Sequence, residues 1–199
     1  MNFLAHLHIA DHCHSSLLGN LLGDFVKGDP AKTYSADLVR GIRLHRSVDS
    51  YIDNHDIIKQ CKVLFSPEKR RFAPIALDMF WDHCLAKHWQ HYHAMPLHHF
   101  VDNAHRDVTA PQVLNAAPLP ERFLRMSEYM WRDRWLESYQ DLDNIQYALE
   151  RMSQRSLRMG MLAECSSDLE LNYQHFLSLF KELYPQVLVH ARYFSQNQP

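Results

Sequence analysis

Apolar residues recur three and four positions apart over most of this chain, a spacing that places them on one side of an α-helix. The first clear stretch covers residues 17–25. It follows Ser15 and Ser16, which suit a helix start, and precedes a Gly-Asp-Pro stop at residues 28–30. The spacing predicts a helix of about three turns here.

The same spacing predicts four further helical regions. We expect them near residues 36–53, 74–91, 97–108 and 135–149. A last long helix should follow a capping box formed by Ser167 and Glu170, and Pro185 should end or kink it. Three prolines between residues 111 and 120 predict the longest irregular stretch.

No alternating run is strong enough to predict a strand, and Gly and Pro are sparse at 5 and 9 residues, so we expect an all-α fold. A chain of 199 residues, 46% of them apolar, is long enough to bury one sizeable core. The prediction is therefore a single-domain helical bundle over residues 1–194 with a frayed tail at 195–199.

Charge and cysteine content exclude several classes of protein. A net charge of −2 argues against a general nucleic-acid binder, which carries a large basic excess. The four cysteines form no C-x-x-C pair, and no apolar run has membrane-spanning length. We expect a cytoplasmic protein with reduced thiols. Histidine is unusually frequent, with fifteen residues, and it is the side chain most used for metal binding and for proton transfer near neutral pH.

Charged residues on faces that should be apolar are candidates for a site, because a metal compensates the cost of a buried carboxylate. Three predicted helices contain them: Asp24 in the first, His45 with Asp49 in the second, and Asp78, Asp82 and His83 in the third. Imidazole and carboxylate together suit Mn, Mg, Fe or Zn. Each candidate taken alone has an ordinary alternative as a hydrogen-bonded core residue, a capping residue or part of a solvated helix face.

Two histidines near the start of the chain, His6 and His8, lie on different faces if their segment is helical, so only one should point inward. We favour His6. The six histidines between residues 88 and 105 are scattered around helical faces, and we interpret most of them as solvated.

Several segments together resemble the bacterial acyl carrier protein phosphodiesterases. They are residues 1–7 (Met-Asn-Phe-Leu-Ala-His-Leu), residues 19–26, Gly41-Ile42 with His45-Arg46 and Asp49, and Trp81-Asp82-His83. The chain is also similar, more distantly, to the helical HD phosphohydrolases. The adjacent pair Asp82-His83 is reversed relative to the His-Asp pair of that group, and the other candidates precede it.

The resemblance implies hydrolysis of the phosphodiester that links 4′-phosphopantetheine to a serine of holo-acyl carrier protein, with Mn²⁺ as the expected metal and Mg²⁺ or another divalent ion as alternatives. Asp24, His45, Asp78, Asp82 and His83, with His6 nearby, would surround the metal. Arg46 or Arg43 would neutralise phosphate charge, and Asp49 would orient a water or a ligand histidine.

An acidic carrier requires a local basic patch on a chain of net charge −2. Two basic runs next to the candidate helices are expected to supply it: Arg40 and Arg43, and Lys69, Arg70 and Arg71. Two alternatives stay open at this point. One is a metal phosphohydrolase of the HD type acting on a nucleotide, and the other is a non-catalytic module that only binds an acyl carrier protein.

Overall fold

The computed structural model describes residues 1–114 and 118–198, and within these residues it contains helices and loops and no strand. The α-helices are α1 (Phe3–His12), α2 (Leu17–Leu22), α3 (Ala36–Asp53), α4 (Asp56–Val63), α5 (Ala73–Lys87), α6 (Leu97–Thr109), α7 (Pro111–Leu114), α8 (Glu121–Arg132), α9 (Trp135–Ser138), α10 (Leu142–Ser153), α11 (Cys165–Leu171) and α12 (Tyr173–Gln196). Short 3₁₀ helices are η1 (Pro30–Lys32), η2 (Arg70–Phe72), η3 (Trp89–His91) and η4 (Leu157–Leu162). The all-α prediction is confirmed.

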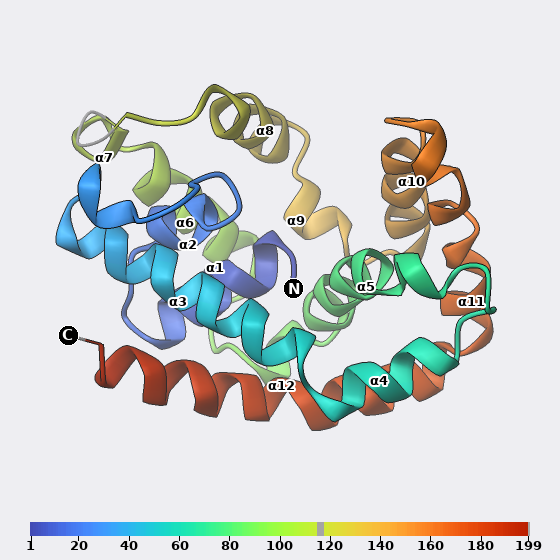
Figure 1. The fold of residues 1–199 in the computed structure, drawn as a ribbon. Coiled ribbons are helices and arrows are strands. Elements are labelled where there is room, and N and C mark those ends of the chain that lie inside the picture. Colours follow the sequence, from blue (N-terminus) through green and yellow to red (C-terminus); the bar gives the residue numbers. More distant parts are fainter. Residues whose placement is uncertain (115–117, 199) are drawn as a thin grey trace.

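The short helix α1 lies at the centre of the molecule (Figure 1). It packs against α2, α3, α5 and α12. Every residue from Leu4 to Ala10 is buried, including His6 and His8, which are 1% and 2% exposed. The expectation that only one of these histidines points inward is therefore wrong, because a helix enclosed on all sides has no solvent face.

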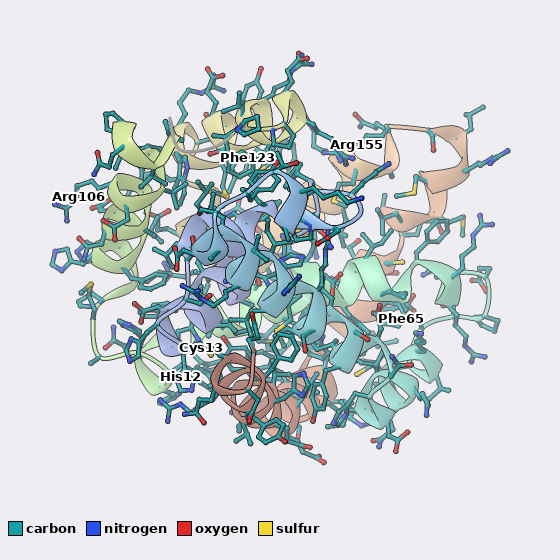
Figure 2. All side chains as sticks on the ribbon, turned by 60° about the vertical axis from the view of Figure 1, so that its left-hand side comes forward. His12, Cys13, Phe65, Arg106, Phe123 and Arg155 are labelled. Carbon is teal, nitrogen blue, oxygen red and sulfur yellow. The ribbon has the colours of Figure 1, made fainter. Side chains whose placement is uncertain are left out.

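The long helix α12 runs along one side of the molecule beside α3 and α4 (Figure 1). Helices α6 to α9 form a layer over the N-terminal helices (Figure 1). Phe123 of α8, labelled in Figure 2, contributes a ring whose centroid lies 5.5 Å from that of Phe25. At the C-terminal end of α1, His12 and Cys13 lie toward α12 (Figure 2). Side chains fill the space between these elements, so the core is continuous.

Helices α2 and α3 cross at a close approach made possible by two glycines. A Cβ on Gly19 would lie 2.8 Å from the Leu38 carbonyl oxygen, and one on Gly41 would lie 2.9 Å from the Gly19 Cα. Only residues without a side chain allow backbones to approach this closely. The crossing fixes the segment after α2 against α3, which is where the candidate site is built.

Several predicted helices differ from the observed ones. α2 stops at Leu22, and the segment after it forms a turn in which the Phe25 and Val26 amides both donate to the Leu22 carbonyl. The stretch predicted at 74–91 is divided into α5 and η3, and the one at 135–149 into α9 and α10, with extended backbone at Asp141 between the last two.

At the C-terminal end, Ser167 lies inside α11 rather than capping α12, and its hydroxyl donates to the Glu164 carbonyl. Pro185 does not end α12, which continues to Gln196, two residues into the expected tail, while residue 199 lies outside the described residues. Residues 111–114 of the predicted irregular stretch form α7, and residues 115–117 lie outside the described part.

Candidate metal centre

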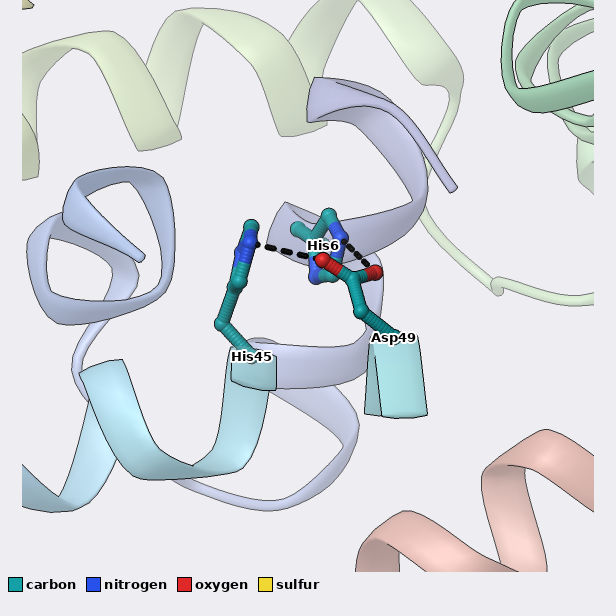
Figure 3. A group of neighbouring side chains, drawn as sticks. All are labelled: His6, His45 and Asp49. Carbon is teal, nitrogen blue, oxygen red and sulfur yellow. Dashed lines mark hydrogen bonds and ion pairs between the residues drawn. The ribbon is translucent and has the colours of Figure 1, made fainter. Parts of the chain in front are cut away.

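Two imidazoles and a carboxylate meet between α1 and α3 (Figure 3). His6 comes from α1, while His45 and Asp49 are one turn apart on α3, so the four-residue spacing brings them to one face. One ligand-type atom from each lies within 4.8 Å of the other two. The two histidines are buried, whereas the Asp49 side chain is 33% exposed and opens the cluster to solvent.

The Asp49 carboxylate bridges the Nε2 atoms at the edges of the two rings. His6 Nε2 is 3.1 Å from its Oδ1, and His45 Nε2 is 3.0 Å from its Oδ2. The rings themselves are stacked, with centroids 3.7 Å apart. Both Nδ1 atoms are buried without a hydrogen-bond partner among the described residues. Among the described residues, the polar contacts of both imidazoles are therefore made at Nε2.

A second carboxylate, Asp24, approaches from the segment after α2. Its Oδ1 lies 3.3 Å from His45 Nε2. This approach requires Gly23, because a Cβ there would lie 2.1 Å from Cγ of the His45 ring. Arg46 ties the same segment to α3 by donating to the carbonyl oxygens of Val26 and Gly28. Sequence reasoning missed Gly23, although its position beside Asp24 is a usable signal.

The donor set fits a divalent ion. Donors that share one ion at about 2.1 Å are separated by about 3.0 Å in octahedral and 3.4 Å in tetrahedral geometry. Single pairs of donor atoms, which involve both Asp49 oxygens, are 3.0, 3.1 and 3.3 Å apart, and one ligand atom from each of His6, His45 and Asp49 lies within 4.8 Å of the other two. Two imidazoles with carboxylates are a donor set that Mn, Fe and Zn accept. His6, His45 and Asp49 could therefore hold a metal, with Asp24 adjacent.

The pKa values of the two histidines in the cluster are shifted in opposite directions. Burial and the neighbouring His45 lower the pKa of His6 to about 4. Burial alone would also lower the pKa of His45, but hydrogen bonds to Asp24 and Asp49 raise it to about 9. Burial opposes ionisation of Asp49, yet the two histidines hold its pKa far below the usual range. Without a metal the cluster is thus an imidazolium between carboxylates, a charge pattern that a divalent cation can replace.

Asp78 lies beside this cluster rather than inside it. Its Oδ1 accepts a hydrogen bond of 2.8 Å from the Met1 amine, which is also 3.6 Å from Asp49 Oδ1. Burial lowers the pKa of this amine, but Asp78 and Asp49 raise it to about 11. The Met1 amine was not among the sequence candidates, because a contact between residues 77 positions apart has no local signal.

The structure gives Asp82 and His83 other partners. Both Asp82 oxygens accept amide hydrogens at the start of α1, from Leu4 at 2.8 Å and Ala5 at 3.1 Å. His83 Nδ1 donates to the Tyr139 carbonyl, and its Nε2 accepts from the Tyr173 hydroxyl, both at 2.8 Å. Neither belongs to the group of close ligand atoms found among the described residues. They were expected to surround the metal, but here they fasten α1 and α5 into the core.

His8, like His83, has hydrogen-bond partners on both ring nitrogens. Its Nδ1 lies 2.7 Å from the Tyr184 hydroxyl and its Nε2 lies 3.1 Å from the Tyr92 carbonyl oxygen. A carbonyl only accepts, so Nε2 carries the proton and Nδ1 accepts from the tyrosine. Burial lowers the pKa of His8 to about 4. His8 therefore links α1 to α12 in its neutral form.

Four of the five arginines and lysines expected to bind a partner reach the surface. Arg40 lies 3.2 Å from Asp37, also on α3, and Arg43 lies 3.7 Å from Asp29, which precedes α3. Arg70 and Arg71 are exposed in η2. Lys69 does not fit the expected patch, because it is only 8% exposed. Its ammonium contacts Asp168 and Ser167 and the Glu164 carbonyl, at 3.0–3.1 Å.

Comparison with known proteins gives a consistent result. A family model described as acyl carrier protein phosphodiesterase matches residues 1–187. Proteins of that name from Enterobacter sp. (strain 638) and Pectobacterium atrosepticum are 45% and 44% identical over 193 residues, covering 96% of this chain and 98% of each relative. One from Serratia proteamaculans is 44% identical over 194 residues. No solved structure matches the chain, so the expected likeness to HD phosphohydrolases stays a prediction.

Proposed function

The chain belongs to the acyl carrier protein phosphodiesterase family, and from this premise we propose that it removes 4′-phosphopantetheine from holo-acyl carrier protein. Water would cleave the phosphodiester, leaving apo-carrier with a free serine and releasing 4′-phosphopantetheine. The observation that carries the proposal is the cluster of His6, His45 and Asp49, which is buried on the histidine side and open at Asp49.

The cofactor that we propose is Mn²⁺, with Mg²⁺ or another divalent ion as alternatives. His6, His45 and Asp49 would hold it, and Asp24 would complete the set on the solvent side, where its side chain is 61% exposed. When bound, the ion would polarise a phosphoryl oxygen and acidify a water for attack on phosphorus. Family membership favours a carrier-protein substrate over the nucleotide alternative, and an enzyme over the non-catalytic module.

Residues of the chain itself would orient the reactants. Asp49 accepts from both histidines and so fixes their rings. Arg46 and Arg43 remain the proposed cations for the phosphate charge. In the free protein Arg46 holds the segment that bears Asp24, and Arg43 lies 3.7 Å from Asp29. Arg43 is therefore the one less constrained by backbone contacts.

For the partner surface, we propose Arg40, Arg43, Arg70 and Arg71, and we omit the buried Lys69. These cations suit an acidic carrier, because complementary charge speeds encounter. No helix among the described residues is both long and apolar enough to cross a membrane. We also propose a cytoplasmic location, which agrees with four cysteines that form no disulfide.

Mass spectrometry of holo-carrier before and after incubation tests this function. We expect conversion to apo-carrier with Mn²⁺, none in excess chelator, and recovery when Mn²⁺ is returned. Asp49→Ala should abolish conversion, whereas Asp53→Ala, one turn further on α3 and exposed, should retain it. Full activity in chelator would refute the metal, and intact holo-carrier under every metal condition would refute the substrate.

A further inference from the structure

A groove of about 410 Å³ runs between α3 and α12. Two of its lining residues, Arg46 and Ser50, also flank the candidate metal centre. Successive residues turn by 100° around a helix, so Arg46 and Ser50 lie about 60° and 100° around α3 from Asp49. The groove therefore adjoins the Asp49 face of α3 only at its Arg46 and Ser50 edge, and it extends to the opposite face, where Ser47 and Tyr51 each lie about 160° from Asp49.

Much of the groove lining is aromatic and can form hydrogen bonds. The rings of Tyr51 and His190 are stacked with centroids 4.3 Å apart, and Phe194 follows on α12. A hydrogen bond of 3.0 Å joins Ser47 Oγ to His190 Nε2 and fixes the imidazole. The groove thus offers flat apolar faces and hydroxyl groups to a ligand.

Its charged lining residues are cationic. Arg43 and Arg46 line its α3 side, and none of the described residues that line it is a carboxylate. This lining suits a ligand that is neutral over most of its length and also carries a negative charge. The volume also restricts the occupant, because ten residues of α-helix, with a diameter of about 10–12 Å, occupy more than about 1,000 Å³. The groove accommodates an extended chain and is too small to bury a carrier helix.

We propose that this groove binds the pantetheine arm of the substrate, with the amide chain along Tyr51, His190 and Phe194 and the phosphate at the cluster of His6, His45 and Asp49. This inference rests on the proposed function and extends it to a substrate subsite. The arm has a dimethyl-substituted carbon, two amides and a thiol, so it can use both the aromatic faces and the hydroxyls. The enzyme would distinguish holo-carrier from other phosphodiesters by this contact.

Titration with free pantetheine tests the subsite without turnover, because pantetheine contains no phosphate. Followed by NMR, the wild-type protein should bind it with a Kd on the order of 0.1–1 mM. Phe194→Ala should weaken this binding about tenfold, since it removes an aromatic face. Ser50→Trp, at an exposed position that fills the groove, should also weaken it. Tyr193→Ala, at the exposed neighbouring position of α12, is the matched control and should bind like wild type.

Apo-carrier, which lacks the arm, separates the two possible occupants. Its affinity should be the same for wild type and Phe194→Ala if the groove binds the arm. If Phe194→Ala lost as much affinity for apo-carrier as for pantetheine, the groove would contact the carrier protein itself, and the proposal would be overturned. So would undetectable pantetheine binding at about 20 mM, far above the expected Kd. Failure of the proposed function is distinct, because it appears as intact holo-carrier in the mass spectrum.

Discussion

Asp24 and Asp82 both lie on faces that the sequence predicts to be apolar and helical, yet their carboxylates have opposite surroundings. Asp24 is 61% exposed and contacts one histidine, whereas Asp82 is fully buried and accepts two amide hydrogens of α1. A carboxylate at a helix start satisfies donors that have no partner within the helix. The two aspartates should therefore differ in what their loss affects.

We expect Asp82→Ala to lower the free energy of unfolding by about 2–4 kcal/mol, because it leaves the Leu4 and Ala5 amides buried and unsatisfied. Asp24→Ala should change it by less than about 1 kcal/mol but remove most hydrolytic activity. Urea denaturation and the holo-carrier assay measure the two effects. Equal destabilisation by both substitutions would contradict the assignment of Asp82 to the core.

The neutral state of His8 gives the protein a specific pH dependence. The pKa of His8 is about 4 in the folded protein and 6.5 in the unfolded chain, so between these values the unfolded chain binds the additional proton. Stability is therefore lost as the pH falls from about 6.5 to 4, by about 3 kcal/mol from this residue. His8→Gln keeps a donor and an acceptor without titrating. The difference in unfolding free energy between the wild-type protein and His8→Gln, measured by urea denaturation, should shrink as the pH falls through this range. A difference that stays constant with pH would refute this role of His8.

At the scale of elements, the crossing of α2 and α3 decides where Asp24 lies. Gly19 and Gly41 bring the two backbones into contact, and Gly23 then places Asp24 beside His45. A helix only six residues long has little stability alone. The geometry of the site therefore depends on how closely these two helices pack.

Gly41→Ala should lower the unfolding free energy by about 1–3 kcal/mol and reduce activity, because its Cβ would meet the Gly19 Cα at 2.9 Å and push the helices apart. Gly160→Ala is the control. No atom of the described residues lies within 4 Å of the added Cβ there, and the thermal midpoint of this variant should match wild type or exceed it slightly. Equal midpoints for both variants would show that the crossing tolerates a wider separation.

At the scale of the whole molecule, a chain of net charge −2 must attract an acidic carrier through a local surface. Arg40, Arg43, Arg70 and Arg71 reach the surface next to the elements that surround the site, whereas Lys69 is bound internally to Asp168. The proposed partner surface therefore consists of the four arginines, of which Arg40 and Arg43 lie 3.2 and 3.7 Å from Asp37 and Asp29.

Reversing Arg70 and Arg71 to Glu should lower kcat/KM for holo-carrier at low salt about tenfold and flatten its salt dependence, while kcat changes little, because long-range attraction acts on association. The control reverses Arg125 and Arg132 on the exposed face of α8. A salt series of kcat/KM measures both. Wild-type values for the Arg70 and Arg71 variant at low salt would place docking elsewhere.

The sequence by itself determined the all-helical class, the positions of α3 and α6, and the shared face of His45 and Asp49, because helical periodicity is a local property. It also determined the family, through several short segments and near full-length similarity. It could not choose among six candidate ligands. The contacts of Asp82 with α1, of His8 with Tyr184 and of Lys69 with Asp168 join residues about 75–175 positions apart.

Only the tertiary structure decided which charged groups meet. His6 joins His45 and Asp49 because α1 is enclosed by its neighbours, and the groove exists because α12 returns beside α3. Periodicity specifies which face of a helix is apolar but not which helix packs against it. The partners of each buried polar group therefore follow from packing between distant segments, and with them the difference between a site residue and a structural one.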